Sequence, residues 1–104
     1  MEKYLLVYRG GGGMAETPEA QQAVMAQWTK WFESLGPAVV DGGNPVMKTQ
    51  MVGAGATQMP DGSGVSGYSV LQAESLAAAV KMAEGCPILG AGGGIEVCET
   101  MNVM

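Results

Sequence analysis

The chain contains no histidine among its 104 residues. This absence removes the commonest general base near neutral pH and the commonest metal ligand in proteins. Only two cysteines occur, Cys86 and Cys98, and they provide neither a disulfide framework nor a zinc-binding spacing. We therefore expect free thiols in a cytoplasmic protein, with no metal and no organic cofactor.

Positive charge and long apolar runs are also scarce. Five Lys and Arg stand against ten Asp and Glu, for a net charge of −5, and the basic residues form no patch. A surface that binds nucleic acid or an anionic membrane is therefore not expected. No apolar run approaches the roughly 18 residues of a membrane span. The opening MEKYLLVYRG has the pattern of a strand and not of a signal peptide.

Glycine and methionine are abundant instead, with 17 and nine residues. The glycines gather in four clusters, so they mark loops between elements. The clusters lie near residues 10–13, 42–43, 53–67 and 90–94. At this length we expect a single domain over residues 1–104.

The first glycine cluster formally fits a dinucleotide-binding fingerprint at Gly10, Gly12 and Ala15. In that motif the helix opens within the glycines, whereas here the helix signal begins later, at Thr17. No second βαβ unit follows either. We therefore expect a plain connection or a loop over a pocket, and no nucleotide.

The longest helix signal runs from Thr17 to Gly36. Thr17 is a good N-cap, Pro18 suits the first helical position, and Gly36 suits the C-terminal cap. Apolar residues recur on one face of this helix. They are Ala20, Val24, Trp28, Trp31 and Leu35, and Met25 and Phe32 widen the stripe. Tryptophans at this spacing are most often core residues, and one of the two could also line a ligand pocket.

The segment Lys3–Arg9 is rich in β-forming residues and apolar on both faces. Tyr4, Leu6 and Tyr8 point one way, and Leu5 and Val7 point the other. This pattern predicts a central strand that is covered on both sides. One face should meet the tryptophans, and the other needs a separate cover.

The rest of the chain predicts further extended pieces and one more helix. Extended structure is expected over residues 38–41, 45–52, 65–73 and 95–101. Ser75 should cap a helix that ends at Gly85 and whose inner stripe is Leu76, Ala79, Val80 and Ala83.

This order of elements predicts an α+β, ferredoxin-like fold, an antiparallel sheet with two helices on one face. Contiguous apolar faces that stay exposed mark interfaces. The doubly apolar first strand therefore predicts a symmetric homodimer that packs sheet against sheet. The dimer contact is expected to involve Tyr4, Leu6 and Tyr8.

Several segments resemble the YCII-related family in its DGPF-type branch. They are KYLLVYRG, MAQWTKWFESLG, VDGGNPV, GYSVLQAESLAAAVKMAEGCP and GGGIEV. The likeness runs from Lys3 to about Val97 and is most specific over residues 67–87. It implies a ferredoxin-like fold and dimers of the α/β-barrel kind, with a cleft between the sheet and the first helix.

Two departures from the family bear on chemistry. The Asp-Gly-Pro-Phe segment that names the branch is reduced here to Asp61 and Gly62, followed by Ser63 and Gly64. Other YCII-related proteins carry a His–Asp pair implicated in lactone or dehydrochlorination chemistry. This chain lacks histidine, so that mechanism does not transfer.

Six polar or aromatic residues are candidates for the cleft. Tyr8, Arg9, Trp28 and Glu99 are the ligand-binding candidates, and Asp41 and Tyr68 are the catalytic ones. A buried Asp41 with a raised pKa could act as a general base, but an Asx-turn residue holding its own backbone is the favoured interpretation. Tyrosines in strands are more often packing residues. Glu99 could instead pair with Arg9 or Lys3 across strands.

Three functional hypotheses follow. The first is a homodimeric module that binds a small molecule between the sheet and the first helix. The second is a lyase or isomerase acting on a small hydroxylated ring or lactone, with Asp41 and a tyrosine. The third is a protein-interaction subunit without a ligand. The absence of histidine and of metal ligands favours the first and the third.

Overall fold

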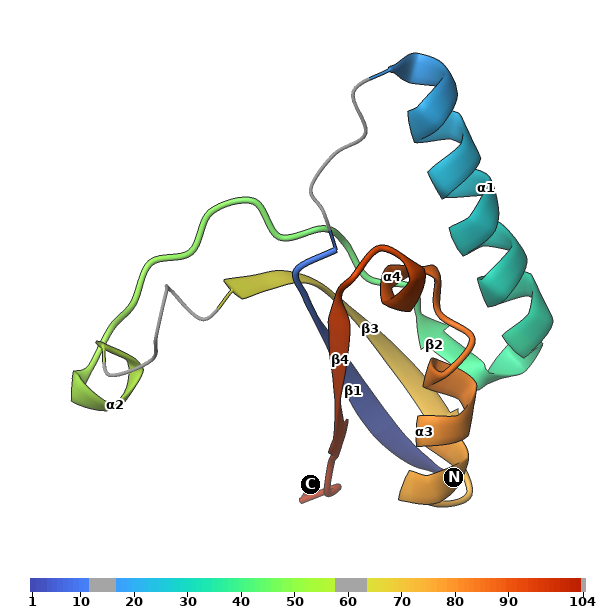
Figure 1. Ribbon diagram of the computed structural model, residues 1–104. Helices are drawn as coiled ribbons and strands as arrows, with labels where there is room; N and C mark the ends of the chain where they lie inside the picture. The colour runs from blue at the N-terminus through green and yellow to red at the C-terminus, as the bar shows by residue number, and fades with distance from the viewer. Residues whose placement is uncertain (12–16, 58–63, 104) are drawn as a thin grey trace.

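The structure, a computed structural model, describes residues 1–11, 17–57 and 64–103. A four-stranded antiparallel sheet in the order β2-β3-β1-β4 forms its centre (Figure 1). The strands are β1 (Glu2–Arg9), β2 (Val39–Asp41), β3 (Val65–Ala73) and β4 (Gly94–Glu99). The helices are α1 (Pro18–Leu35), the 3₁₀ turn η1 (Gly36–Ala38), α2 (Ala54–Thr57), α3 (Leu76–Ala83) and α4 (Pro87–Gly90). This order interleaves two βαβ units, which confirms the ferredoxin-like α+β prediction.

Strand β1 lies between β3 and β4, as its two apolar faces predict. Tyr4 is opposite Leu71 on one neighbour and Glu99 on the other. Leu5 is likewise opposite Val70 and Cys98. Because residues directly opposite share a face, the register assigns every side chain of the sheet to one side.

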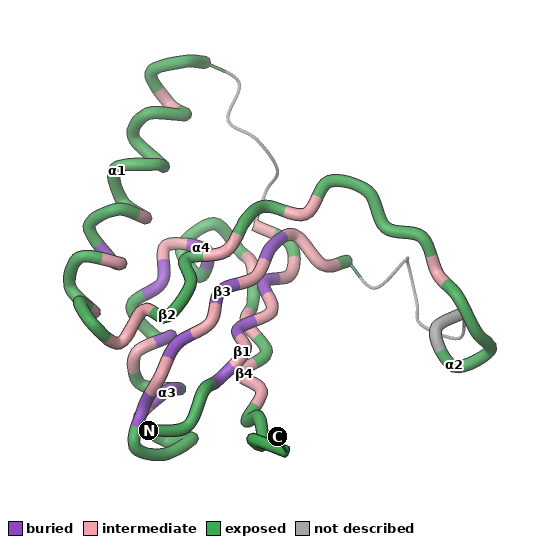
Figure 2. The backbone as a smooth tube through the Cα atoms, turned by 180° about the vertical axis from the view of Figure 1, so that it is seen from behind, coloured by how far each residue is buried: buried purple, intermediate pink, exposed green. Residues whose placement is uncertain are grey.

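The two faces of the sheet have different surroundings. Tyr4, Leu6 and Tyr8 lie on the inner face, against the helices, and are buried. Leu5 and Val7 lie on the outer face and are only half-buried, so buried and half-buried residues alternate along the strand (Figure 2). The expectation that Tyr4, Leu6 and Tyr8 form the dimer face is therefore wrong, because the helices of the same chain already cover these residues.

Helix α1 begins and ends where its capping residues predict. The Oγ1 of Thr17 accepts a hydrogen bond from the N–H of Ala20 at 3.1 Å, and Gly36 takes a φ of 56° at the other end. Only Trp31 is buried on this helix, whereas Met25 is 68 % exposed. The first half of α1 stands clear of the sheet in both views (Figures 1 and 2). The apolar stripe is thus longer than the surface that it covers.

Helix α3 packs through its smallest residues. Ser75 caps it by accepting from the N–H of Ala78 at 3.1 Å. Ala79 and Ala83 are buried, whereas Leu76 and Val80 are each 41 % exposed. The prediction that all four line the core is wrong for Leu76 and Val80. Methyl side chains let the helix approach the sheet closely, and the larger residues then remain at its rim.

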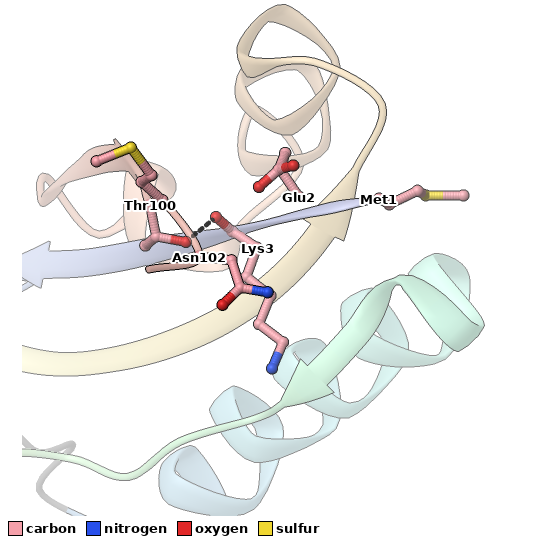
Figure 3. A pocket seen from close by; sticks show the side chains of 6 residues that line it. Met1, Glu2, Lys3, Thr100 and Asn102 are labelled. Atoms are coloured by element: carbon pink, nitrogen blue, oxygen red, sulfur yellow. Dashed lines mark hydrogen bonds between the residues drawn. The ribbon is translucent and has the colours of Figure 1, made fainter. Parts of the chain in front are cut away.

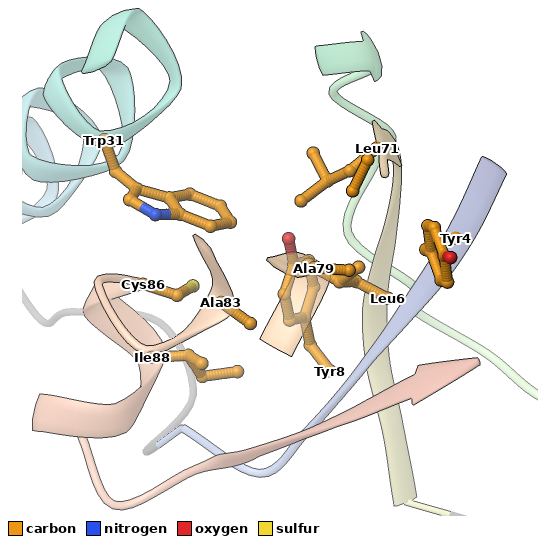
Figure 4. Packing of buried hydrophobic residues seen from close by; sticks show 10 residues of the cluster. Tyr4, Leu6, Tyr8, Trp31, Leu71, Ala79, Ala83, Cys86 and Ile88 are labelled. Carbon is orange, nitrogen blue, oxygen red and sulfur yellow. The ribbon is translucent and has the colours of Figure 1, made fainter. Parts of the chain in front are cut away.

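The core joins the inner face of the sheet to α1 and to the turn after α3. Trp31 projects from α1 towards Cys86 and Ile88, and Tyr8 and Leu6 of β1 lie beside these residues (Figure 4). Cys86 is buried and, like Cys98, is a free thiol. The short helix α4 carries Ile88 and precedes the glycine cluster near residues 90–94, and no helix was expected there.

Residues 45–52 are extended, as predicted, but form no strand. Pro45 makes an isolated antiparallel bridge to Gly67, and pairing stops there. The segment then runs away from the sheet to α2 (Figure 1).

Candidate functional site

The inner face of the sheet carries one buried polar chain. The Tyr8 hydroxyl donates to the Ser69 Oγ at 2.8 Å, and Ser69 donates to the carbonyl oxygen of Gly42 at 2.7 Å. Ser69 is fully buried and Tyr8 is nearly so. Burial raises the pKa of Tyr8 to about 12, against the lowering effect of its bond to Ser69. Both hydroxyls therefore stay protonated at neutral pH.

Aromatic rings from α1 cover this chain. The Trp28 and Tyr8 rings meet edge to face, with centroids 5.1 Å apart and planes at 79°. Trp28 also lies 5.8 Å from Trp31 and 6.0 Å from Phe32. Trp31 is fixed further by its indole N–H, which donates to the carbonyl oxygen of Met82 at 3.1 Å. Trp28 is only half-buried, as is Phe32, so solvent reaches the cluster at these two rings.

Two hollows of the described surface lie elsewhere, at the end of the sheet where the chain begins. One, of about 350 Å³, is lined by Met1, Glu2, Lys3, Thr100, Met101 and Asn102 (Figure 3). The other, of about 520 Å³, has Glu99 in its wall. Between α1 and the sheet, the rings of Tyr8, Trp28, Trp31 and Phe32 occupy the space where the family resemblance implies a cleft.

Asp41 begins the turn after β2, and Tyr68 lies on β3 beside that turn. The Oδ1 of Asp41 accepts from the N–H of Gly43 at 2.8 Å, which is an Asx-turn, and the residue is exposed. Asn44 donates its side-chain N–H to the Tyr68 hydroxyl at 3.3 Å. The favoured interpretation of Asp41, a residue that holds its own backbone, matches this geometry.

Arg9 and Glu99 are not neighbours. Arg9 forms an ion pair with Glu96 through its Nε on the outer face of the sheet. Glu99 lies opposite Tyr4 on β4, so the expected pairing of Glu99 with Arg9 is wrong. Burial raises the pKa of Tyr4, and the carboxylates of Glu99 and Glu2 raise it further.

The six candidates therefore separate into distinct places. Tyr8 and Trp28 are in contact on the inner face, and Tyr68 of β3 contacts Asn44 in the turn that Asp41 begins. Arg9 belongs to the outer face and Glu99 to the end of the sheet. Sequence reasoning missed Ser69, although a serine among the inward positions of an apolar strand is a usable signal for a buried hydroxyl.

Several residues named in the sequence analysis lie outside the part of the chain that the structure describes. Gly12, Ala15, Asp61 and Gly62 lie outside the described ranges. Within those ranges no group of three or more Cys, Asp or Glu is placed to hold a metal ion. No helix in the described parts has the length and apolarity needed to cross a membrane.

Comparison with known protein families identifies the family of this chain. The family model of the YCII-related domain matches residues 3–103. No curated protein matches the chain. The match spans nearly the whole sequence, and the chain therefore belongs to the YCII-related family.

Proposed function

We propose that this protein is a homodimeric small-molecule-binding module of the DGPF-type branch. The observation that carries the binding proposal is the position of Trp28. Its half-buried indole lies beside solvent on one side and against Tyr8 on the other, with the hydroxyl of Ser69 at the base of the same cluster.

The surface next to Trp28 suits a flat, largely apolar ring. Val24 and Met25 precede Trp28 by one turn of α1 and are 44 % and 68 % exposed. An indole edge or face favours a stacked or edge-to-face aromatic partner, and a flexible methionine adapts to rings of different outline. The net charge of −5 favours a neutral or cationic ligand over an anionic one.

The outer face of the sheet supports the homodimer. Leu5, Val7 and Val70 lie together there and are half-buried. Apolar side chains that gather on one face and stay partly exposed mark an interface.

Native mass spectrometry of freshly purified protein tests both parts. We expect a dimer that carries a retained small molecule. Titration with a panel of aromatic metabolites should change the tryptophan fluorescence, and Trp28→Phe should abolish the change because Trp31 is buried. A monomer at micromolar concentration contradicts the dimer. An empty dimer with a flat titration contradicts the binding site and favours the interaction-subunit hypothesis.

A second candidate, a lyase or isomerase on a small hydroxylated ring or lactone, rests on Asp41 and Asn44 of the turn after β2 and on Tyr68 of β3, whose hydroxyl contacts Asn44. Asp41 would take a proton from carbon and Tyr68 would donate to the developing oxyanion. Asp41→Asn preserves an oxygen acceptor for the turn and removes the base. A turnover that survives this substitution contradicts the assignment.

A further inference from the structure

Between the sheet and α2 the chain forms an extended arm, which we define as Met47–Val52. It leaves the sheet beyond the end of β1 and projects away from the body of the molecule in both views (Figures 1 and 2). The radius of gyration of the chain is 14.6 Å, whereas a compact domain of this length has about 13 Å. The arm is one of the two parts, with the first half of α1, that extend the shape.

The base of the arm is held firmly to β3. The N–H of Val46 donates to the carbonyl oxygen of Ser66 at 3.0 Å, and the N–H of Tyr68 donates to that of Asn44 at 3.3 Å. Pro45 forms a β-bridge with Gly67 between these two bonds. The direction in which the arm leaves is therefore set by the sheet itself.

Beyond its base the arm has the character of a strand without a sheet. None of the described residues 47–53 makes a hydrogen bond within the chain. Met47 and Val52 are 83 % and 88 % exposed. Extended backbone with unpaired N–H and C=O groups and apolar side chains is a template for pairing with another strand.

A free strand edge of matching length exists on β4. Among the described residues β4 pairs with β1 on one side and with no strand on the other. It spans six residues, as the arm does, whereas the opposite edge strand β2 spans three. β4 carries Glu96 and Glu99, and the arm carries Lys48 and no acid, so the charges are complementary.

The arm cannot reach this edge on its own chain without crossing the sheet, because β3 and β1 lie between β2 and β4. We propose that the arm of one copy adds as an extra strand to the free edge of β4 in a second copy. Two-fold symmetry repeats the exchange, so both β4 edges and both arms are paired. The inference rests on the homodimer of the proposed function and assigns it a second interface beyond the outer sheet face.

Disulfide trapping with the native Cys98 of β4 tests the exchange. Single cysteines are placed in turn at the arm positions, for which Thr49→Cys and Gln50→Cys are neighbouring examples, and the protein is oxidised mildly. A disulfide forms only where the two Cβ atoms approach within about 4.5 Å. Cys98 has one directly opposite residue on a neighbouring strand, and the residues two positions away on the same face lie about 7 Å off. We therefore expect a covalent dimer at one arm position and none at the positions next to it, whose side chains point to the opposite face. The same variants on a Cys98→Ser background should give none, and unsubstituted protein sets the background.

The outcomes distinguish the arm exchange from the homodimer itself. A dimer in native mass spectrometry that gives no covalent product at any arm position overturns the exchange and leaves the proposed dimer standing. A disulfide inside one chain overturns it as well, because the arm then returns to its own β4. A monomer at micromolar concentration overturns the proposed dimer and the exchange with it. A covalent dimer at one arm position, absent at the positions next to it and lost with Cys98→Ser, supports the exchange.

Discussion

At the scale of single residues, the two tryptophans of α1 have unequal roles. Trp31 is buried and its indole N–H is paired, whereas Trp28 keeps part of its ring in water. We expect Trp31→Ala to lower the free energy of unfolding by about 3–5 kcal/mol. Trp28→Ala should cost less, about 1–2 kcal/mol, because less apolar area leaves water there. Urea unfolding at one fixed protein concentration measures both, and equal losses would contradict this ranking.

Because of Tyr8, we expect the folded protein to lose stability at alkaline pH. Its pKa is about 12 in the folded chain against 10.0 when unperturbed. Between these values the unfolded chain releases the proton first, so the folded state binds more protons and its stability falls as pH rises. The loss attributable to Tyr8 is about 1.4 kcal/mol at pH 11 and negligible at pH 8.

The variant Tyr8→Phe isolates this effect. Urea unfolding at the two pH values should show a smaller loss for Tyr8→Phe than for the unsubstituted protein. Cys86 also titrates in this range, since burial raises its pKa to about 11, but it contributes equally to both proteins. Identical pH dependences would show that Tyr8 ionises normally.

The candidate site was predictable where it follows from strand and helix periodicity. Alternation along β1 predicts that one of its faces meets the tryptophans but leaves open which one, and the structure shows that it is the face of Tyr8, whose ring lies 5.1 Å from that of Trp28. The partner Ser69 and its acceptor, the Gly42 carbonyl, come from segments distant in sequence. Such contacts depend on the register between strands, which alternation alone leaves open.

At the scale of elements, the turn after β2 depends on one glycine. A Cβ at Gly43 would lie 1.7 Å from the backbone oxygen of Tyr68, and the φ of 75° disfavours a side chain in any case. At Gly42 the nearest atoms to an added Cβ are on the Phe32 ring at 3.8 Å, which is ordinary contact. We expect Gly43→Ala to destabilise the fold by about 3 kcal/mol or more. Gly42→Ala is the matched control and should cost less than about 1 kcal/mol. Thermal unfolding of the two variants tests this prediction. Similar melting temperatures would contradict the close approach of Gly43 to the Tyr68 backbone.

Elements with a strong period were predictable, and short or unpaired ones were not. The predicted range 65–73 coincides with β3, Val65–Ala73, because alternation and flanking glycines define it. Helix α4 has four residues, too few to show a helical period. Residues 45–52 are extended as predicted, but pairing also requires a neighbour that the same chain does not supply beyond Pro45. On α3, the alanines lie at the closest approach to the sheet, and Leu76 and Val80 stay exposed. Which residues of the helix are buried depends on the distance between helix and sheet, and a helical period does not specify that distance.

At the scale of the whole molecule, the proposed homodimer places the outer sheet face at its interface. Val7 lies in the middle of β1, opposite Tyr68 on one side and Glu96 on the other. Val7→Glu places a carboxylate beside that of Glu96 on a face that two copies would bury together. Burying an unpaired charge is strongly unfavourable, so we expect the dimer dissociation constant to rise at least about 100-fold.

The control for this change is Val24→Glu, since Val24 is an exposed residue of α1 on the opposite side of the sheet. It adds the same charge without touching the outer face, and the dimer should persist. Sedimentation equilibrium over a range of concentrations measures both variants. A Val7→Glu protein that stays dimeric would exclude the outer face as the interface. The exchanged arms would form a separate interface, so Val7→Glu could leave a weak dimer. If shortening the arm in the Val7→Glu protein then removes this weak dimer, both contacts hold the two copies together.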